Sequence, residues 1–250
     1  MKKGALTIVG LGPARPEHMT NEALMVLRGA SNGKSCLYAL QHARKMVHNV
    51  FPDLYIRSLD YLYDIPGVER PMAYRDLAQM MLRKAFQDGE EVIYLVAGSP
   101  LFYNDAVLLI RKMAVKKKLP IRLVHGMSFV DLVLDQVHWT GFHGLQLYSA
   151  WNIAHDDVLL STEAPALLCQ LGEFSAAGDA LDTTRSSSML VVLQQKLLCV
   201  YPEEHLVSIL YSSGPPNYGS LSEVVALKEL AQRTVPVYSN LWIPRLEEEK

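Results

Sequence analysis

The sequence predicts an α/β protein of two domains, and three features of the chain support this. Apolar runs of strand length alternate with segments of helical periodicity in the first half, as in a mostly parallel sheet covered by helices. Strands are denser and helices fewer in the second half, which predicts a mixed sheet. The length of 250 residues fits two domains of ordinary size. We expect these domains at residues 1–122 and 123–250.

In the first half, strands are predicted from buried apolar runs and helices from apolar residues three and four positions apart. The first predicted helix has Thr20 as its N-cap, and Glu22 in its first turn complements the helix dipole. The predicted strands cover residues 5–10, 54–59, 91–96 and 121–124, and the predicted helices cover 19–28, 70–87 and 105–117.

In the second half, the same criteria predict more strands than helices. Pro244 closes the last strand, and the charged residues after it are expected to fray. The predicted strands cover residues 145–149, 166–170, 206–211 and 235–243, and the predicted helices cover 128–137 and 187–200.

The charge and cysteine content exclude several classes of function. Lys plus Arg is 24 and Asp plus Glu is 26, a net charge of -2, which offers no electrostatic footprint for nucleic acid or an anionic membrane. Cys36, Cys169 and Cys199 form no Cys-x-x-Cys pair, and no histidine spacing matches a common metal site, so we expect no metal. We find no convincing signal peptide and no run of roughly 20 apolar residues. The expectation is a cytoplasmic protein.

Three glycine-containing loops follow predicted strands, where ligands bind in open α/β sheets. The first is Gly10-Leu11-Gly12-Pro13, the second is Ala97 to Phe102, and the third is Gly126 to Phe129. A dinucleotide fingerprint would need a third glycine where Arg15 stands, so binding of NAD is not predicted. Each loop alone could be purely structural, but three together predict a ligand site.

A group of tyrosines and one arginine is a second candidate site. Arg70 and Tyr74 are four residues apart on one predicted helix, and Tyr61 and Tyr63 precede them. A guanidinium beside a phenol favours the phenolate and could create a base for a reluctant proton. The alternative, which spacing alone leaves open, is that these tyrosines pack with their hydroxyls at the rim.

Taken together, these motifs resemble the tetrapyrrole methylase superfamily, whose members use S-adenosylmethionine. The resemblance runs from Thr7 to Thr20, through the second and third glycine loops, to Tyr201-Pro202-Glu203-Glu204-His205. It implies two α/β domains with the cofactor in the cleft between them, usually as a homodimer. The cofactor-binding residues expected from the loops and the resemblance are Gly10, Gly12, Pro13, Gly98, Ser99, Pro100, Leu101, Phe102, Ser128, Phe129, Gln146, Cys169, Gln170, Gly214 and Pro215.

This sequence departs from the pattern of the superfamily at two positions. Ala14 stands where a further glycine is usual, and Ser99 stands where Asp or His is usual. The change at Ser99 leaves the fold intact but replaces the Asp or His side chain that makes the usual polar contact of that loop. Both departures leave open a non-catalytic module that binds S-adenosylmethionine or acts as a scaffold.

Two subfamilies are similar to this chain. One is the methylase-like domain fused to MazG-type nucleotide pyrophosphohydrolases, which Gly126 to Gln146 resembles. The other is the borosin peptide backbone N-methyltransferases, whose tyrosine and arginine pattern matches Tyr63, Arg70 and Tyr74. We therefore expect a methyltransferase for backbone amides of a separate precursor peptide, with Tyr74 or Tyr63 as base, Arg70 as electrostatic support, and Tyr61 nearby. The alternative acceptor is a tetrapyrrole or another small molecule.

Overall fold

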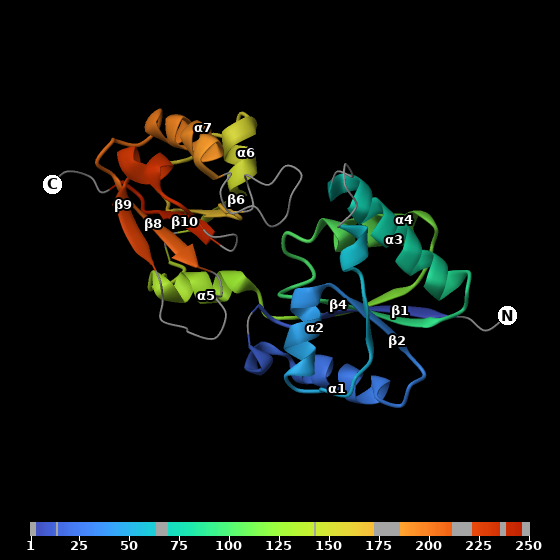
Figure 1. Cartoon of the computed structure of the whole chain (residues 1–250). Helices are drawn as coiled ribbons and strands as arrows, with labels where there is room; N and C mark the ends of the chain where they lie inside the picture. The colour runs from blue at the N-terminus through green and yellow to red at the C-terminus, as the bar shows by residue number, and fades with distance from the viewer. Residues whose placement is uncertain are drawn as a thin grey trace. The chain divides into compact units, whose positions relative to one another are not determined.

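The computed structural model describes residues 4–13, 15–63, 70–142, 144–172, 186–211, 222–235 and 239–246. The chain divides into two compact units, Met1–Phe129 and Val130–Lys250. Each unit contains its own five-stranded sheet (Figure 1). The observed division follows the third glycine loop, whereas the sequence placed it before that loop, after residue 122. The whole loop at the end of the last strand therefore belongs to the first unit.

The sheet of the first unit is parallel throughout, with the strand order β3-β2-β4-β1-β5. β1 lies between β4 and β5, so that Leu6 is paired with both Val92 and Ile121. Because helices cover both faces, the strands read as continuous apolar runs. The strands are β1 (Ala5–Gly10), β2 (Cys36–Ala39), β3 (Ile56–Ser58), β4 (Glu91–Val96) and β5 (Ile121–Val124).

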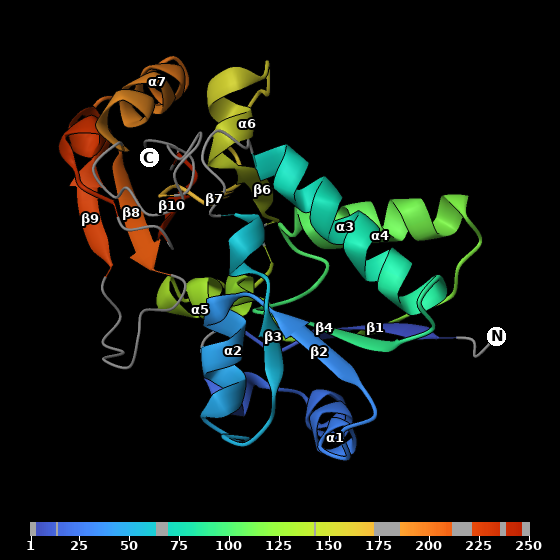
Figure 2. The ribbon, with the colours of Figure 1, turned by 45° about the vertical axis from the view of Figure 1, so that its right-hand side comes forward.

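Two pairs of helices cover the two faces of this sheet (Figure 2). α1 (Asn21–Ala30) and α2 (Gln41–His48) pack on one face, and α3 (Arg70–Phe86) and α4 (Asp105–Lys116) pack on the other. The Thr20 hydroxyl accepts a hydrogen bond from the Ala23 N–H at 3.2 Å, which confirms the predicted N-cap of α1. Short 3-10 helices, η1 (Pro16–His18) and η2 (Asp60–Leu62), follow β1 and β3.

The sheet of the second unit is mixed, as predicted, with the order β6-β7-β10-β8-β9. β6 and β7 run parallel, whereas β10 is antiparallel to both β7 and β8, and β9 is antiparallel to β8. The elements are β6 (Gln146–Ser149), α6 (Ala150–His155), β7 (Ala166–Cys169), α7 (Ser186–Leu198), β8 (Leu206–Tyr211), β9 (Glu223–Ala226), η3 (Leu227–Gln232) and β10 (Ser239–Ile243), with α5 (Phe129–Gln136) entering from the first unit.

The sequence missed two short helices. α2 buries only Ala43, Met46 and Val47, too narrow an apolar stripe to be read as a helix, and α6 has only six residues. Of the strand predicted over 235–243, the described residues show β10, Ser239–Ile243, whereas residues 236–238 lie outside them. Within the described residues, no helix is long and apolar enough to cross a membrane.

Candidate functional site

The three glycine loops of the first unit meet at the carboxyl edge of its sheet. β4, β1 and β5 are neighbours, and the chain leaves each strand through one of these loops. The Gly98 N–H donates to the Gly12 carbonyl oxygen at 2.7 Å, and the Gly12 N–H donates back to the Gly98 carbonyl at 3.3 Å. The structure thus brings the residues Gly10, Gly12 and Pro13 together with the loop of Gly98.

Two of these glycines are required by close contact between backbones. A Cβ on Gly10 would lie 2.6 Å from the Gly126 nitrogen, and a Cβ on Gly126 would lie 2.5 Å from the Gly98 carbonyl oxygen. Gly98 differs, because its φ is +73° and an added Cβ would meet no atom within 4 Å. Gly98 is a buried residue, but the side of its main chain that a Cβ would occupy has room, which is what close approach of a ligand to a backbone requires.

The rest of the second loop forms a turn beside this space. The Ser99 hydroxyl accepts a hydrogen bond from the Leu101 N–H at 3.3 Å, so Ser99 shapes its own turn. Pro100 is buried, whereas the Leu101 side chain is 49% exposed. The predicted residues of this loop therefore divide into a buried base and an exposed tip.

Aromatic rings from the second and third loops form a cluster at the same edge. The ring of Phe102 lies edge-on to the rings of Tyr103, at 4.9 Å, and Phe129, at 5.8 Å between centroids. Ser128 is half-buried next to Phe129. Tyr103 has a left-handed φ of 47°, a strained conformation for a residue with a side chain and one that is common at functional sites. The sequence analysis did not single out Tyr103, although it follows directly on the predicted loop.

In the second unit, Cys169 and Gln170 lie together where β7 ends. Cys169 is fully buried, and Gln170 has a left-handed φ of 61°. The Gln170 N–H donates to the Oδ1 atom of Asn240 at 3.2 Å, and Asn240 is itself only 2% exposed. The buried side-chain amide of Asn240 therefore fixes the backbone just after the last residue of β7. The sequence analysis missed Asn240.

Gln146 lies apart from Cys169 and Gln170, contrary to the grouping expected from sequence. It begins β6 and pairs with Ala166, the first residue of β7, so it lies at the opposite end of these parallel strands. Its side-chain Nε2 atom donates to the carbonyls of Ser161 and Ala164, each at 2.8 Å, and its Oε1 atom accepts from the Ser161 N–H at 2.8 Å. These bonds hold the loop that precedes β7. Gly214 and Pro215 lie outside the described residues.

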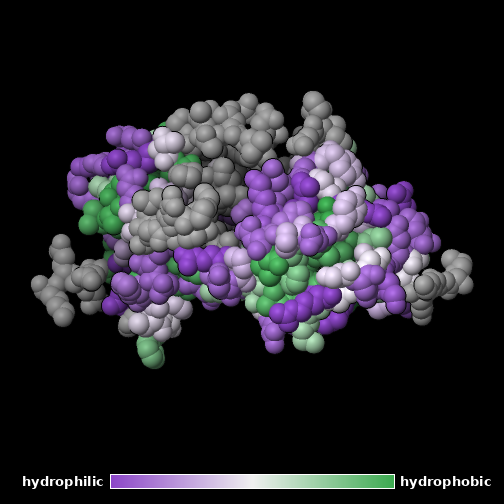
Figure 3. All heavy atoms as spheres, turned by 60° about the horizontal axis from the view of Figure 1, so that its bottom comes forward, coloured by the Kyte–Doolittle hydropathy of each residue, from purple (hydrophilic) through white to green (hydrophobic). Residues whose placement is uncertain are grey.

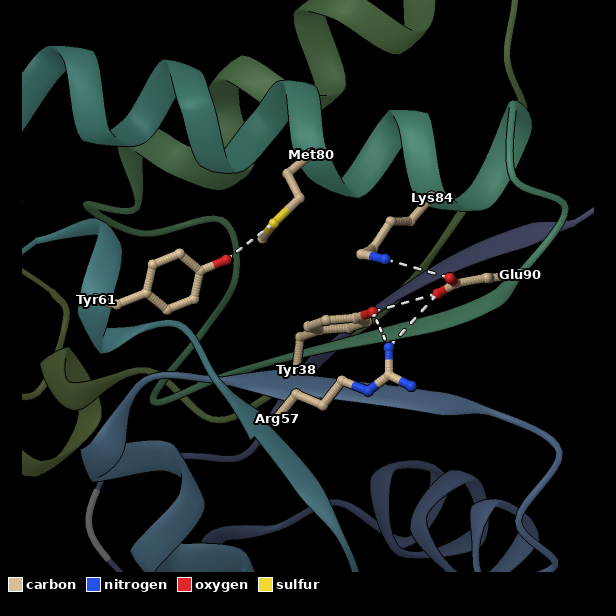
Figure 4. Close-up of polar contacts among 6 residues, drawn as sticks. All are labelled: Tyr38, Arg57, Tyr61, Met80, Lys84 and Glu90. Atoms are coloured by element: carbon tan, nitrogen blue, oxygen red, sulfur yellow. Dashed lines mark hydrogen bonds and ion pairs between the residues drawn. The ribbon is translucent and has the colours of Figure 1, made fainter.

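The tyrosines of the second candidate site are brought together on the α3 face of the first unit. The rings of Tyr63 and Tyr74 are in edge contact, with centroids 5.8 Å apart and planes inclined at 62°. Tyr61 is 54% exposed and donates from its hydroxyl to the sulfur of Met80 at 3.3 Å (Figure 4). Arg70 is the first residue of α3, and its side chain lies outside the described part of the structure.

Tyr94 joins this group from the sheet beneath. It lies in the middle of β4, is 2% exposed, and was not predicted to belong to the site. Burial strongly raises the pKa of Tyr94, and the nearby Tyr74 raises it further. The signal in the sequence was the Tyr94 hydroxyl, the single polar group within the apolar run Val92 to Val96. Burial of a hydroxyl costs free energy, so its presence in a buried strand points to a role.

A separate polar cluster lies toward the amino ends of the strands, near the end of α3. The Tyr38 hydroxyl accepts from Arg57 at 2.7 Å and donates to Glu90 at 3.2 Å, and Lys84 donates to the other oxygen of Glu90 at 3.2 Å (Figure 4). Partial burial acts to raise the pKa of Glu90, but the hydrogen bond and charge of Lys84, with further hydrogen bonds from Tyr38 and Cys36, outweigh burial, and the pKa lies below its ordinary value. We interpret this cluster as structural, because it ties the end of α3 to β2, to β3 and to the start of β4.

Two surface hollows of the first unit do not coincide with the glycine loops. One, of about 630 Å³, lies between the end of α1 and residues 50–55, and the other, of about 620 Å³, lies between α3 and α4. Figure 3, which looks onto the α1 side of the molecule, shows hydrophobic surface interspersed with hydrophilic side chains. Volume alone does not identify a site, and the place of Gly98 among the three glycine loops is the more specific signal. Among the described residues, no three His, Cys, Asp or Glu side chains could hold a metal ion together.

Comparison with known proteins gives a match to one protein family. The sequence model of the tetrapyrrole (corrin/porphyrin) methylases matches residues 5–142, more than half of the chain. The uncharacterized protein YabN of Bacillus subtilis is 24% identical over 99% of this chain and 46% of its own length. A relative from Phlebiopsis gigantea, described as a methyltransferase/ribosomally synthesized type II borosin cyclic peptide precursor, is 22% identical over 97% of this chain and 43% of its own length. The chain spans under half the length of these two curated relatives.

Solved structures show the same fold. The uroporphyrin-III-C-methyltransferase of Thermus thermophilus matches with a TM-score of 0.66 and 17% identity, covering 97% of this chain and 93% of that one. Its complex with S-adenosylhomocysteine matches with a TM-score of 0.62 and 15% identity, covering 96% of this chain and 97% of that one. At sequence identities this low, the similarity shows that the folds are alike.

Proposed function

The chain belongs to the tetrapyrrole methylase family, and from this premise we propose that it is an S-adenosylmethionine-dependent methyltransferase for backbone amides of a separate peptide. Three observations support the proposal. The family match covers the glycine loops, the fold matches methyltransferases, and a borosin relative aligns over 97% of the chain. The choice of a peptide backbone amide as the acceptor rests on the contact between Tyr63 and Tyr74.

The first unit fits S-adenosylmethionine at its glycine loops. Open space at Gly98 leaves room for a ligand against the main chain, and a fold relative is described with S-adenosylhomocysteine. The Phe102, Tyr103 and Phe129 rings gather in the same loops, and aromatic faces attract cations such as a sulfonium. When bound, S-adenosylmethionine supplies a methyl group on a positively charged sulfur. In the second unit, Cys169 and Gln170 are our candidates for further contacts.

The acceptor proposal rests on the chemistry of an amide. Its nitrogen is a poor nucleophile while it keeps its proton, so a base must remove that proton before or during methyl transfer. We assign this base to Tyr74, with Tyr63 as the alternative and Arg70 as electrostatic support for the phenolate. The amide proton passes to the tyrosinate, a nitrogen–carbon bond forms, and the carbon–sulfur bond breaks, leaving S-adenosylhomocysteine.

Tyr94 is a neutral neighbour of Tyr74. Burial raises the pKa of Tyr94 above the ordinary value of a phenol, and the nearby Tyr74 raises it further. We propose that Tyr94 keeps its proton while Tyr74 acts as the base.

A tetrapyrrole or another small molecule is the second candidate acceptor. The name of the matching family and the description of the Thermus thermophilus enzyme favour it. The two acceptors ask for different surroundings, since a tetrapyrrole carries carboxylates that call for basic side chains and a neutral peptide does not. Binding at the cofactor site would be the same for both.

Two measurements test the proposal in order. Calorimetry with S-adenosylmethionine and S-adenosylhomocysteine tests the cofactor, and absence of binding by both would reject methyl transfer altogether. Coexpression with peptides encoded beside the gene tests the acceptor, through a mass gain of one methyl group per modified amide. Methylation of a tetrapyrrole but of no peptide would leave the second candidate. Light scattering tests the homodimer that we propose for the active enzyme.

A further inference from the structure

The carboxylate of Asp60 holds together three segments that meet after β3. Its Oδ1 atom accepts from the Gln41 N–H at the start of α2, at 2.7 Å. Its Oδ2 atom accepts from the Arg44 guanidinium at 2.6 Å and from the Ser58 hydroxyl at 2.5 Å. The Asp60 N–H donates back to the Ser58 oxygen at 3.1 Å. One side chain therefore fixes η2 to both α2 and the end of β3.

The candidate catalytic tyrosines follow directly on this carboxylate. Asp60 is the first residue of η2, Tyr61 is the second, and the Tyr63 N–H donates to the Asp60 carbonyl oxygen at 2.8 Å. Leu59, just before, is fully buried, and its N–H donates to the Ala39 carbonyl at 3.0 Å. The η2 turn is thus anchored on its sheet side, while Tyr61 and Tyr63 extend from it to Met80 and Tyr74 on α3.

We propose that Asp60 is the positioning residue that sets Tyr61 and Tyr63 against α3, so that the phenols stand where the acceptor amide is deprotonated. This inference rests on the proposed function for the role of the tyrosines. In this proposal Asp60 acts through the η2 turn that carries both tyrosines. Geometry matters for such a site, because displacement of a catalytic group by about 1 Å can lower a rate by roughly 100-fold.

The contacts of Asp60 favour a geometric role over an ion pair that only adds stability. The side chains of Arg44 and Asp60 are 27% and 29% exposed, so water weakens their charge attraction. Partial burial acts to raise the pKa of Asp60, but the Ser58 hydroxyl, the Gln41 N–H and Arg44 together lower it. The carboxylate is therefore charged at neutral pH and engaged on both oxygens, which orients the turn.

The test uses the full chain and the variant Asp60→Asn, in which the amide can keep the Gln41 bond but presents a donor to Arg44. The first measurement is nitration of tyrosines by tetranitromethane, mapped by mass spectrometry, and it requires no activity. Tyr55, 78% exposed, serves as the internal reference. Asp53→Asn, at an exposed carboxylate in the preceding loop, is the matched control variant.

We expect Asp60→Asn to change nitration of Tyr61 and Tyr63 while Tyr55 and the Asp53→Asn protein stay as in the wild type. With an active acceptor, we expect kcat to fall about 10- to 100-fold with little change in affinity for S-adenosylmethionine, and Asp60→Glu to recover part of the loss. Unchanged nitration and kcat, with only a lower unfolding temperature, would overturn the inference. If the wild type methylates no acceptor, the proposed function fails, and the nitration result still decides the role of Asp60.

Discussion

Replacement of Gly98 by alanine tests whether the space beside Gly98 receives the cofactor. The substitution also strains the backbone, and Gly33→Ala is a matched control for that strain. Gly98 has a φ of +73° and Gly33 has a φ of +74°, and an added Cβ would meet no atom within 4 Å at either position. Gly98 follows β4 among the glycine loops, whereas Gly33 lies in the turn between α1 and β2. The two substitutions therefore impose the same conformational strain and differ in what the new methyl group faces.

The expected stability cost is similar for the two variants. A left-handed backbone costs a residue with a Cβ about 1–2 kcal/mol, and for a chain of this size each kcal/mol lowers the unfolding temperature by about 2–4 °C. Neither site adds a steric clash. Cofactor affinity should differ, because the methyl group of Gly98→Ala occupies the space that we assign to S-adenosylmethionine. We expect at least a tenfold weaker Kd there, equivalent to about 1.4 kcal/mol, and no change for Gly33→Ala.

Thermal unfolding and calorimetry with S-adenosylhomocysteine measure the two quantities separately. Equal shifts in unfolding temperature, with loss of affinity only in Gly98→Ala, would support a cofactor site at this loop. Wild-type affinity in the folded Gly98→Ala protein would refute the argument that the open space at Gly98 receives the cofactor.

Three further predictions concern packing, catalysis and pH. Gly126→Ala should destabilise the first unit by about 1–3 kcal/mol or more, because the new Cβ would lie 2.5 Å from a backbone oxygen; an unfolding temperature like that of the wild type would contradict this. Tyr74→Phe should lower methyl transfer by about 100-fold without weakening S-adenosylmethionine binding, and should lower the pKa of Tyr94 in a spectroscopic titration; unchanged kcat would exclude Tyr74 as the base. The pKa of Glu90 is lower in the folded protein than its ordinary value of 4.5, so its contribution to stability is complete above pH 4.5 and is lost as the pH falls through the lower value. In Glu90→Gln, the unfolding temperature should therefore fall less steeply with pH below about 4.5 than in the wild type.

Periodicity located the long elements well because their signals are local. Buried strands such as β1 and β4 were predicted with their observed bounds, and α3 and α4 ended within one residue of the prediction. α2 and α6 were missed because short helices owe their stability to tertiary packing, and each of the two buries only three residues. The predicted boundary after residue 122 and the division of the structure after Phe129 differ by one loop, since no change in composition marks where that loop ends.

The candidate site was predictable where it depends on strand ends and unpredictable where it depends on register. The Gly12 and Gly98 loops follow neighbouring strands, so their contact could be foreseen. Gln146 could not be placed, because only the pairing of β6 with β7 shows that it lies at the other end from Cys169. Tyr94 and Asn240 are buried polar residues whose partners are distant in sequence, and no local pattern connects them with Tyr74 or Gln170.

The position of β1 has a consequence for the order of assembly of the first unit. β1 is made first, yet it lies between β4 and β5, whose residues follow more than 80 positions later in the chain. Contacts so distant in sequence form slowly, and an apolar strand such as β1 is prone to aggregation until it is paired with β4 and β5. The Gly10, Gly98 and Gly126 junction can close only when β5 has been added. A ligand bound at this junction would therefore report, and stabilise, completion of the whole first unit during synthesis.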